Sequence, residues 1–188
     1  LEERKVHIAR NHGSFVYPAE FMLVAAMNPC PCGNYPDMQK CSCTPRQIEQ
    51  YLGKISQPFL DRMDLCIETP RVQYQELEAT KKEETSEVIR KRVSIARDIQ
   101  KERYKTGKAD TNAMLGPREI ATYVRLGKEE KKLMEQAFEK LGLTARTYHK
   151  ILRVARTIAD LEQSTEVKSI HLKEAIGYRS LDKKYWGR

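Results

Sequence analysis

The chain has 188 residues, of which 40% are hydrophobic and 32% are charged, enough for one mid-sized domain or two small ones with their own cores. Its net charge of +8 predicts only mild affinity for nucleic acid, because the basic residues are spread along the chain. No run of about 18 apolar residues occurs, so we expect no transmembrane span and no membrane partner. No signal peptide is visible at the first residues, which predicts a cytoplasmic protein.

Strand signals dominate up to Pro70. Val6 and Ile8, and then residues 15–17, flank the turn-forming sequence Asn-His-Gly at 11–13, which predicts a β-hairpin. Residues 21–27 form a continuous apolar run, which is typical of a buried parallel strand. A shorter apolar run at 65–67 predicts another strand, and a short helix is expected over residues 47–52.

After Pro70 the sequence becomes helical. Residues 81–84 read as a solvated connector, and Thr85 or Ser86 can cap a helix whose apolar residues continue to Ile99. Gly142 is expected at the C-terminal cap of a helix, and Thr144 at the N-cap of the next. The further helices are predicted over 117–124, 128–141, 144–161 and 170–178.

The helix that begins near Thr144 separates apolar and basic residues. At about 100° per residue, its basic residues gather opposite an apolar face. Three interpretations stay open: a solvated basic face, arginines directed at a phosphate, and a stripe that binds nucleic acid. The basic residues are Arg146, His149, Lys150, Arg153 and Arg156.

Four of the five cysteines lie in one short loop, as Cys30-x-Cys32 and Cys41-x-Cys43. Clustering in a chain without a secretion signal favours a metal over a disulfide framework. Four thiolates can complete a closed tetrahedral site for structural Zn²⁺. Free thiols or an adventitious disulfide are the alternatives, and Cys66, in the predicted strand 65–67, is expected in the core.

Several segments together resemble the magnesium-chelatase-like AAA+ ATPases of bacteria. The resemblance covers nearly the whole chain in order. Its segments are KVHIAR at 5–10, YPAEFMLVAAMNPCPCG at 17–33, LDRMD at 60–64, LTAR at 143–146, ILRVARTIADL at 151–161 and YRSLD at 178–182.

The resemblance implies an α/β remnant of an AAA+ P-loop ATPase core followed by an all-α helical lid domain. Residues 1–75 would be the later part of the core, 76–84 a linker, and 85–188 the lid. The Walker A and Walker B segments would lie upstream. Gly107-Lys108 is no substitute, because Glu102 stands where the first glycine is needed and Ala109 replaces Ser or Thr. We therefore expect this chain alone to lack ATPase activity.

Two residues of the first domain correspond to ATPase positions. Asn28 resembles sensor 1, an amide that holds the attacking water near the γ-phosphate, although Asn before Pro is also a simple turn former. Arg62 resembles the arginine finger that a neighbouring subunit supplies. Its alternative is a local salt bridge to Asp61 or Asp64. Gln57 stands where the family commonly has glycine.

The resemblance assigns further residues to nucleotide and nucleic acid. Arg146 resembles sensor 2 at the start of the lid helix, and Arg153 lies two turns further along the same face. The hairpin corresponds to those that line the pore of related hexameric helicases, so its polar residues would contact phosphates. These residues are Lys5, His7, Arg10, Asn11 and His12.

The expected function is that of an ATP- and Mg²⁺-dependent motor that remodels DNA. We expect it to assemble as a homo-oligomer, a ring of six subunits. The alternative is the ATPase subunit of a metal-chelatase-type complex that acts on a protein partner. Salt-dependent DNA binding by the intact oligomer separates the two.

Overall fold

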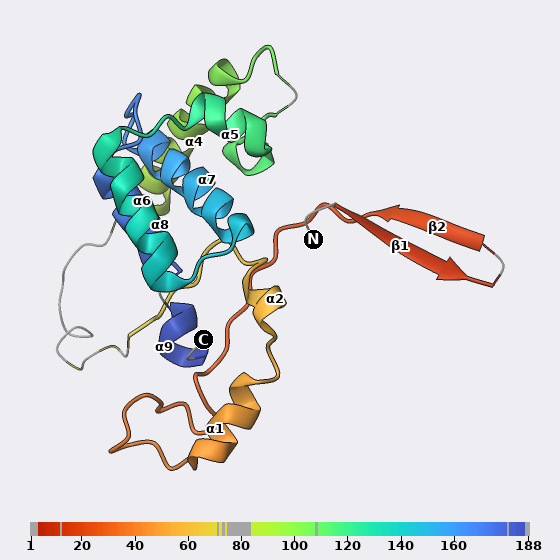
Figure 1. Cartoon of the computed structure of the whole chain (residues 1–188), viewed down its shortest axis with the longest axis vertical. Coiled ribbons are helices and arrows are strands. Elements are labelled where there is room, and N and C mark those ends of the chain that lie inside the picture. Colours follow the sequence, from red (N-terminus) through yellow and green to blue (C-terminus); the bar gives the residue numbers. More distant parts are fainter. Residues whose placement is uncertain are drawn as a thin grey trace. The chain divides into compact units, whose positions relative to one another are not determined.

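The computed structural model describes residues 4–11, 13–70, 72, 74, 84–107, 109–179 and 181–186. His12 and residues 76–83 of the predicted linker therefore lie outside the described residues. The chain divides into two compact units, residues 1–63 with 185–188, and residues 64–184 (Figure 1).

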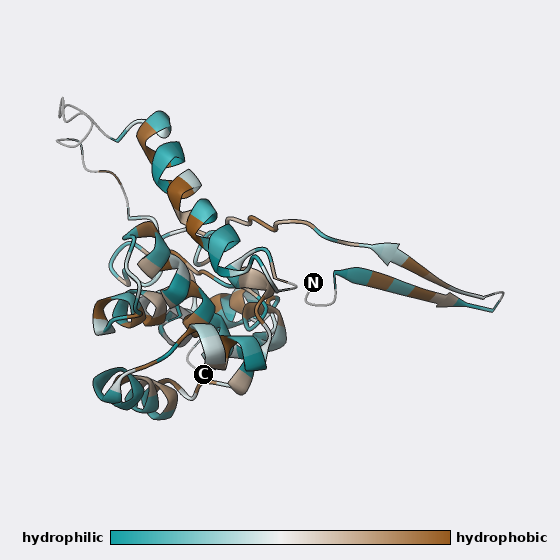
Figure 2. Ribbon diagram, turned by 90° about the horizontal axis from the view of Figure 1, so that it is seen from above, coloured by the Kyte–Doolittle hydropathy of each residue, from teal (hydrophilic) through white to brown (hydrophobic). Residues whose placement is uncertain are grey.

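The first unit begins with the predicted hairpin. Strands β1 (Lys5–Arg10) and β2 (Gly13–Pro18) pair antiparallel, with Lys5 opposite Pro18 and Arg10 opposite Gly13. Gly13 has a φ of +149°, a conformation that residues with a Cβ rarely adopt, so glycine is required where β2 begins. Every residue of both strands is exposed, and hydrophobic and hydrophilic residues alternate along β1 (Figure 2).

The two other predicted strands are wrong for this chain. Residues 21–27 are irregular and exposed, with Met22 at 87% and Val24 at 80% relative exposure. Residues 65–67 are irregular too, and the Cys66 amide donates to the carbonyl of Tyr178. A strand exists only when neighbouring strands accept its backbone hydrogen bonds, and among the described residues only β1 and β2 form a ladder.

The predicted short helix is confirmed as α1 (Pro45–Leu52). Thr44 and Gln47 form a reciprocal capping box at its start, and Pro45 occupies the first turn. The four-residue helix α2 (Gln57–Leu60) follows and was not expected.

The chain returns to this unit at the end of α9 (Leu181–Trp186), a helix that the sequence did not predict. The indole Nε1–H of Trp186 donates to the carbonyl of Leu52 over 2.9 Å, and the ring of Tyr185 meets that of Tyr35 edge to face. Both aromatic residues pack against a small core formed by Cys30, Ile48 and Leu52.

The second unit is a helical bundle, as predicted. Thr85 and Thr144 cap α4 and α7 through their hydroxyls, and Gly142 ends α6 with a left-handed φ of +58°. α7 packs against α4, α5 and α8, and α6 also packs against α8 (Figure 1). The elements are α4 (Ser86–Arg103), the 3₁₀ turn η1 (Asn112–Met114), α5 (Pro117–Tyr123), α6 (Lys128–Leu141), α7 (Ala145–Leu161) and α8 (Ser169–Gly177).

The basic side of α7 is not uniformly solvated. Arg156 is 2% exposed, and its Nε donates to the buried carboxylate of Asp160 over 3.1 Å. Its two other nitrogens donate to the carbonyls of Ser164 and Thr165. Burial lowers the pKa of Arg156, although the carboxylate beside it acts in the opposite direction. The interpretation of a fully solvated face is therefore wrong for this part of the helix.

Asp160 also connects α7 to two other segments. Both of its oxygens accept from the guanidinium of Arg103 at the end of α4, and Asn112 of η1 donates to it over 2.8 Å. Hydrogen bonding to Asp160 raises the pKa of Arg103. One fully buried carboxylate thus joins α4, η1 and α7.

Replacing Asp160 should destabilise the helical unit severely. Asp160→Ala leaves the buried guanidinium of Arg156 without its counter-charge, and the expected loss is about 3–5 kcal/mol in the free energy of unfolding. Urea unfolding followed by circular dichroism measures it. Asp98→Ala, which removes an exposed ion pair on α4, is the control and should cost about 0–1 kcal/mol. Equal effects would contradict the importance of the buried network.

Candidate functional site

The four clustered cysteines converge on one point. The Sγ atom of Cys30 lies 3.4 Å from that of Cys32 and 3.8 Å from that of Cys41, and Cys32 and Cys41 are 3.5 Å apart. The Cys43 sulfur completes the group, and all four sulfurs lie within 4.8 Å of one another. None of the four forms a disulfide.

Backbone turns bring the two cysteine pairs together. The Gly33 amide donates to the Cys30 carbonyl, and Gly33 has a φ of +76°, the left-handed region that favours glycine. The Tyr35 amide donates to the Cys30 sulfur over 3.4 Å. Asn34 donates to the carbonyl of Lys40, which closes the loop between the pairs.

The thiols of the cluster differ in pKa. The backbone amide of Asn34 lowers the pKa of Cys32 to about 5. The backbone amide of Cys43 also lowers that of Cys41, but burial and the neighbouring Cys32 and Cys30 raise it to about 12. Thiolates this close repel one another, and a cation at their centre would stabilise all four.

The spacing of the sulfurs fits a metal ion. Four sulfurs at about 2.3 Å from one tetrahedral centre stand about 3.8 Å from each other. The three sulfur separations quoted above run from 3.4 to 3.8 Å, and Cys30 is fully buried. The cluster can therefore bind a metal ion that prefers sulfur ligands.

Asn28 lies just before this cluster, but not at the end of a strand. It is exposed, and a Cβ built on Gly33 would stand 3.8 Å from its carboxamide. The Asn28 side chain is therefore next to the turn that starts the cysteine loop. Its assignment as sensor 1 stays a prediction.

Arg62 follows α2 and is half-buried. Its Nη1 donates to the carbonyl of Pro58 over 2.6 Å. Asp64, one of the two acids considered for a local salt bridge, accepts instead from Lys150 of α7 over 2.9 Å. Lys150 is itself buried, so this ion pair holds residue 64 to the helical unit.

The two candidate sensor 2 arginines belong to α7, in the second unit. Arg146 is in the first turn of the helix and is exposed. Arg153 is half-buried, and its Nε donates to the carbonyl of Leu115 over 2.9 Å. Of the two, Arg146 has the guanidinium that solvent reaches more readily, while Arg153 connects α7 to the segment before α5.

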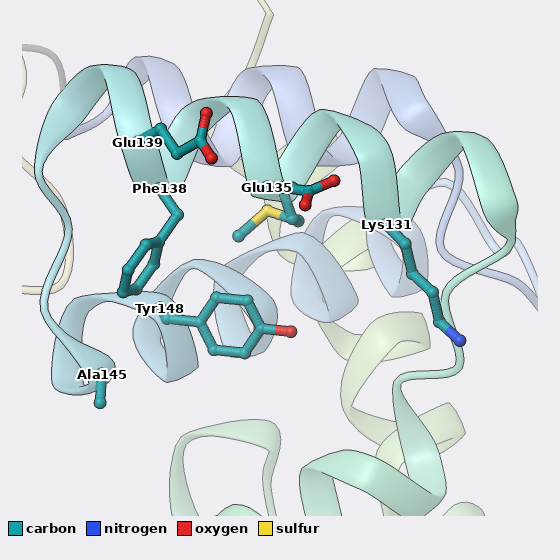
Figure 3. Close-up of a pocket in the computed structure, with 7 residues that line it drawn as sticks. Lys131, Glu135, Phe138, Glu139, Ala145 and Tyr148 are labelled. Atoms are coloured by element: carbon teal, nitrogen blue, oxygen red, sulfur yellow. The ribbon is translucent and has the colours of Figure 1, made fainter.

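A groove beside the start of α7 was not predicted. It has a volume of about 580 Å³ and lies between α6 and the first turns of α7 (Figure 3). The rings of Phe138 and Tyr148 meet edge to face along it, at 6.4 Å between centroids. The one sequence signal for it is Met134 and Phe138, four residues apart on α6. Its lining residues are Lys131, Met134, Glu135, Phe138, Glu139, Ala145 and Tyr148.

The hairpin residues predicted to contact nucleic acid do not share one face. Directly paired residues of antiparallel strands project to the same side, so the register defines two faces. We call one the lysine face: Lys5, His7, Ala9, Ser14, Val16 and Pro18. The other, the ring face, consists of Val6, Ile8, Arg10, Gly13, Phe15 and Tyr17.

The predicted contacts are thus divided around the hairpin. Lys5 and His7 lie on the lysine face, Arg10 lies on the ring face, and Asn11 is exposed in the turn. The aromatic residues of the ring face were missed, although Phe15 and Tyr17, two residues apart in a predicted strand, could have indicated a shared face.

Two family models together match most of the chain. The description "Magnesium chelatase, subunit ChlI" matches residues 1–77, and "Magnesium chelatase, subunit ChlI C-terminal" matches residues 83–179. The chain belongs to the magnesium-chelatase-like family. The predicted resemblance is confirmed.

Relatives in this family match the chain along nearly its whole length. Competence protein ComM of Haemophilus influenzae is 43% identical over 182 residues, which cover 96% of this chain and 35% of the relative. The uncharacterized protein YifB of Salmonella typhimurium is 39% identical over 184 residues, again covering 35% of the relative. The chain thus spans about a third of the length of the curated relatives it matches. Within the described residues, no helix combines the length and apolar character that a membrane crossing needs.

Proposed function

We propose that this chain is the C-terminal part of an AAA+ ATPase that couples ATP hydrolysis to the remodelling of DNA. In this proposal the full-length protein works in the cytoplasm as a homo-oligomeric ring, with six subunits as the expected number. Residues 1–75 contribute the later part of the ATPase core, 76–84 the linker, and 85–188 the helical lid.

The observation that carries the DNA proposal is the exposed hairpin. Residues 5–18 contain Lys5 and Arg10 but no Asp or Glu, and every described residue of the two strands is exposed. A basic ribbon with both faces open to solvent suits a polyanion. The name of the Haemophilus influenzae relative, a competence protein, agrees with a role in DNA processing.

Asn28 and Arg62 would act on the transferred phosphoryl group. Asn28 would position the attacking water, and Arg62 would neutralise charge on the phosphate bound by a neighbouring subunit, with Mg²⁺ bridging the phosphates. The bond from Arg62 to the Pro58 carbonyl is compatible with this role, because a guanidinium carries five N–H donors and the bond fixes its orientation.

Arg146 would act as sensor 2 and bind ATP from the lid. Its exposure favours it over Arg153, whose Nε is bonded to the Leu115 carbonyl. Arg153 would instead have a structural role, because its hydrogen bond joins α7 to the segment before α5. Whether Arg146 serves its own subunit's nucleotide or the neighbour's is decided by mixing subunits, as for Arg62 below.

The chelatase-type alternative rests on the description of the family models. It predicts an ATPase that remodels a protein partner and whose basic hairpin does not bind DNA. Binding of the full-length oligomer to DNA at several salt concentrations separates the two proposals. If the logarithm of the binding constant falls linearly with the logarithm of the salt concentration, the DNA motor is supported. If the oligomer does not bind DNA even at low salt, the chelatase type is supported.

We further infer that the cysteine cluster holds Zn²⁺. Four thiolates leave no open position for substrate, so the ion would be structural. It would hold residues 30–43 against α1 and the aromatic end of α9, because Cys30 belongs to the same core as Ile48, Tyr185 and Trp186.

Protein purified without chelator should contain about one zinc per chain by elemental analysis, because four thiolates complete one zinc site. Cys30→Ser with Cys41→Ser should abolish it, and Cys66→Ser, the cysteine outside the cluster, should keep it. Chelation should shift the fluorescence of Trp186, the single tryptophan, because metal-ligand energy is folding energy at such sites. Metal-free protein with unchanged Trp186 emission would contradict the inference.

Arg62→Ala in the full-length protein should reduce ATP turnover by about 10³-fold or more while nucleotide binding is retained, as expected for a finger supplied in trans. Arg46→Ala, an exposed arginine of α1, is the control and should keep normal turnover. Mixing Arg62→Ala subunits with Walker-A-defective subunits should restore some activity, because an interface can then combine an intact pocket with an intact Arg62. Nearly normal hydrolysis by Arg62→Ala in an assembled ring would remove it from the mechanism.

The 188-residue chain alone should show no ATPase activity above background. It has no glycine-rich loop whose amides cradle phosphates and no lysine placed to reach them. A phosphate-release assay on extensively purified protein measures this. Turnover that co-purifies with the chain through several steps would overturn the assignment of Asn28 and Arg62 as parts of a divided site.

A further inference from the structure

The ring face of the hairpin is unusually apolar for an exposed surface. Val6, Ile8, Phe15 and Tyr17 are 40–55% exposed, and their side chains project to the same side. A two-stranded ribbon is only marginally stable alone, so exposed rings in such a ribbon call for a partner.

The charge of the ribbon identifies the kind of partner. Arg10 stands on the ring face itself, Lys5 and His7 project from the other face, and residues 5–18 contain no acid. Aromatic rings accompanied by cations and by no acidic residue are a combination that binds single-stranded nucleic acid, where bases stack on the rings and the phosphates contact the cations. Burial against a protein surface would explain the rings but not the absence of acids.

The spacing of the rings agrees with this partner. Phe15 and Tyr17 are two residues apart on β2, which separates their backbones by about 6.8 Å. Stacked bases are about 3.4 Å apart, so one base fits between two side chains that stand perpendicular to the ribbon. A base can enter such a gap only when it is unpaired.

We propose that the ring face binds unpaired bases of a single strand by stacking on Phe15 and Tyr17, while Arg10, on the same face, contacts its phosphates. This rests on the proposed function and narrows it from DNA in general to an exposed single strand. In this proposal the aromatic rings contact the bases, and the positive charge attracts the phosphates with a strength that depends on salt.

The test measures binding of a fluorescent oligo-thymidine, and of a duplex of equal length, to the full-length protein. Tyr17→Leu and Phe15→Leu keep apolar volume but remove the ring, so each should weaken single-strand binding by at least about 5-fold, and duplex binding much less. Tyr17→Phe keeps the ring and should bind normally. Val16→Leu, on the lysine face, is the matched control and should also bind normally.

Salt titration separates stacking from charge. The leucine variants should keep the salt dependence of the unmodified protein, because no phosphate contact is lost. Arg10→Gln should instead reduce the slope of log affinity against log salt by about 0.7.

Three results would overturn the inference, and they differ in meaning. Leucine variants that bind the single strand normally, while Arg10→Gln weakens binding, reject stacking and leave the DNA proposal standing. Leucine variants with lower thermal stability, or with a smaller oligomer by sedimentation, would show that another part of the protein or a second copy covers the ring face. Unmodified protein that binds neither oligonucleotide rejects the DNA proposal itself.

Discussion

The helical unit depends on the carboxylate of Asp160. It is fully buried, and it accepts hydrogen bonds from Arg103, Asn112 and Arg156, which come from three different elements. A buried charge is tolerated only when it is paired and hydrogen-bonded, so the positions of α4, η1 and α7 are mutually constrained. The same network holds the C-terminal half of α7, the helix that also carries Arg146 and Arg153.

The first unit is stabilised differently, because its apolar core is small. Cys30, Ile48 and Leu52 form its buried cluster, and the aromatic residues Tyr35 and Trp186 pack around it. A core of this size supplies little free energy against the entropy of ordering the long loop from 28 to 44. The four sulfurs lie close enough together to bind one metal ion. A structural metal is a common source of stability in small domains. The same ion would stabilise the chain between Asn28 and Arg62, the two residues for which we propose roles in phosphoryl transfer.

The sequence predicted best what depends on neighbours in the chain. Thr85, Thr144 and Gly142 mark helix ends because caps act within one turn. The hairpin followed from apolar residues on both sides of a short turn that contains glycine. The convergence of the cysteines was predictable because two close pairs are separated by only eight residues. The strands at 21–27 and 65–67 failed for the opposite reason: apolar composition shows that a segment needs burial, but the groups that bury it lie elsewhere in sequence.

Side-chain roles on α7 show the same limit. Helical periodicity placed Arg153 and Arg156 on one polar side, yet the structure joins Arg153 to Leu115, and buries Arg156 between Asp160 and the carbonyls of 164 and 165. Helical periodicity shows on which face of the helix a residue lies. It does not show which other segment of the chain packs against that face. Arg146 differs because it stands in the first turn, before the bundle covers that side. Arg146 is exposed, Arg153 is half-buried and Arg156 is buried, so burial discriminates among these arginines where sequence spacing does not.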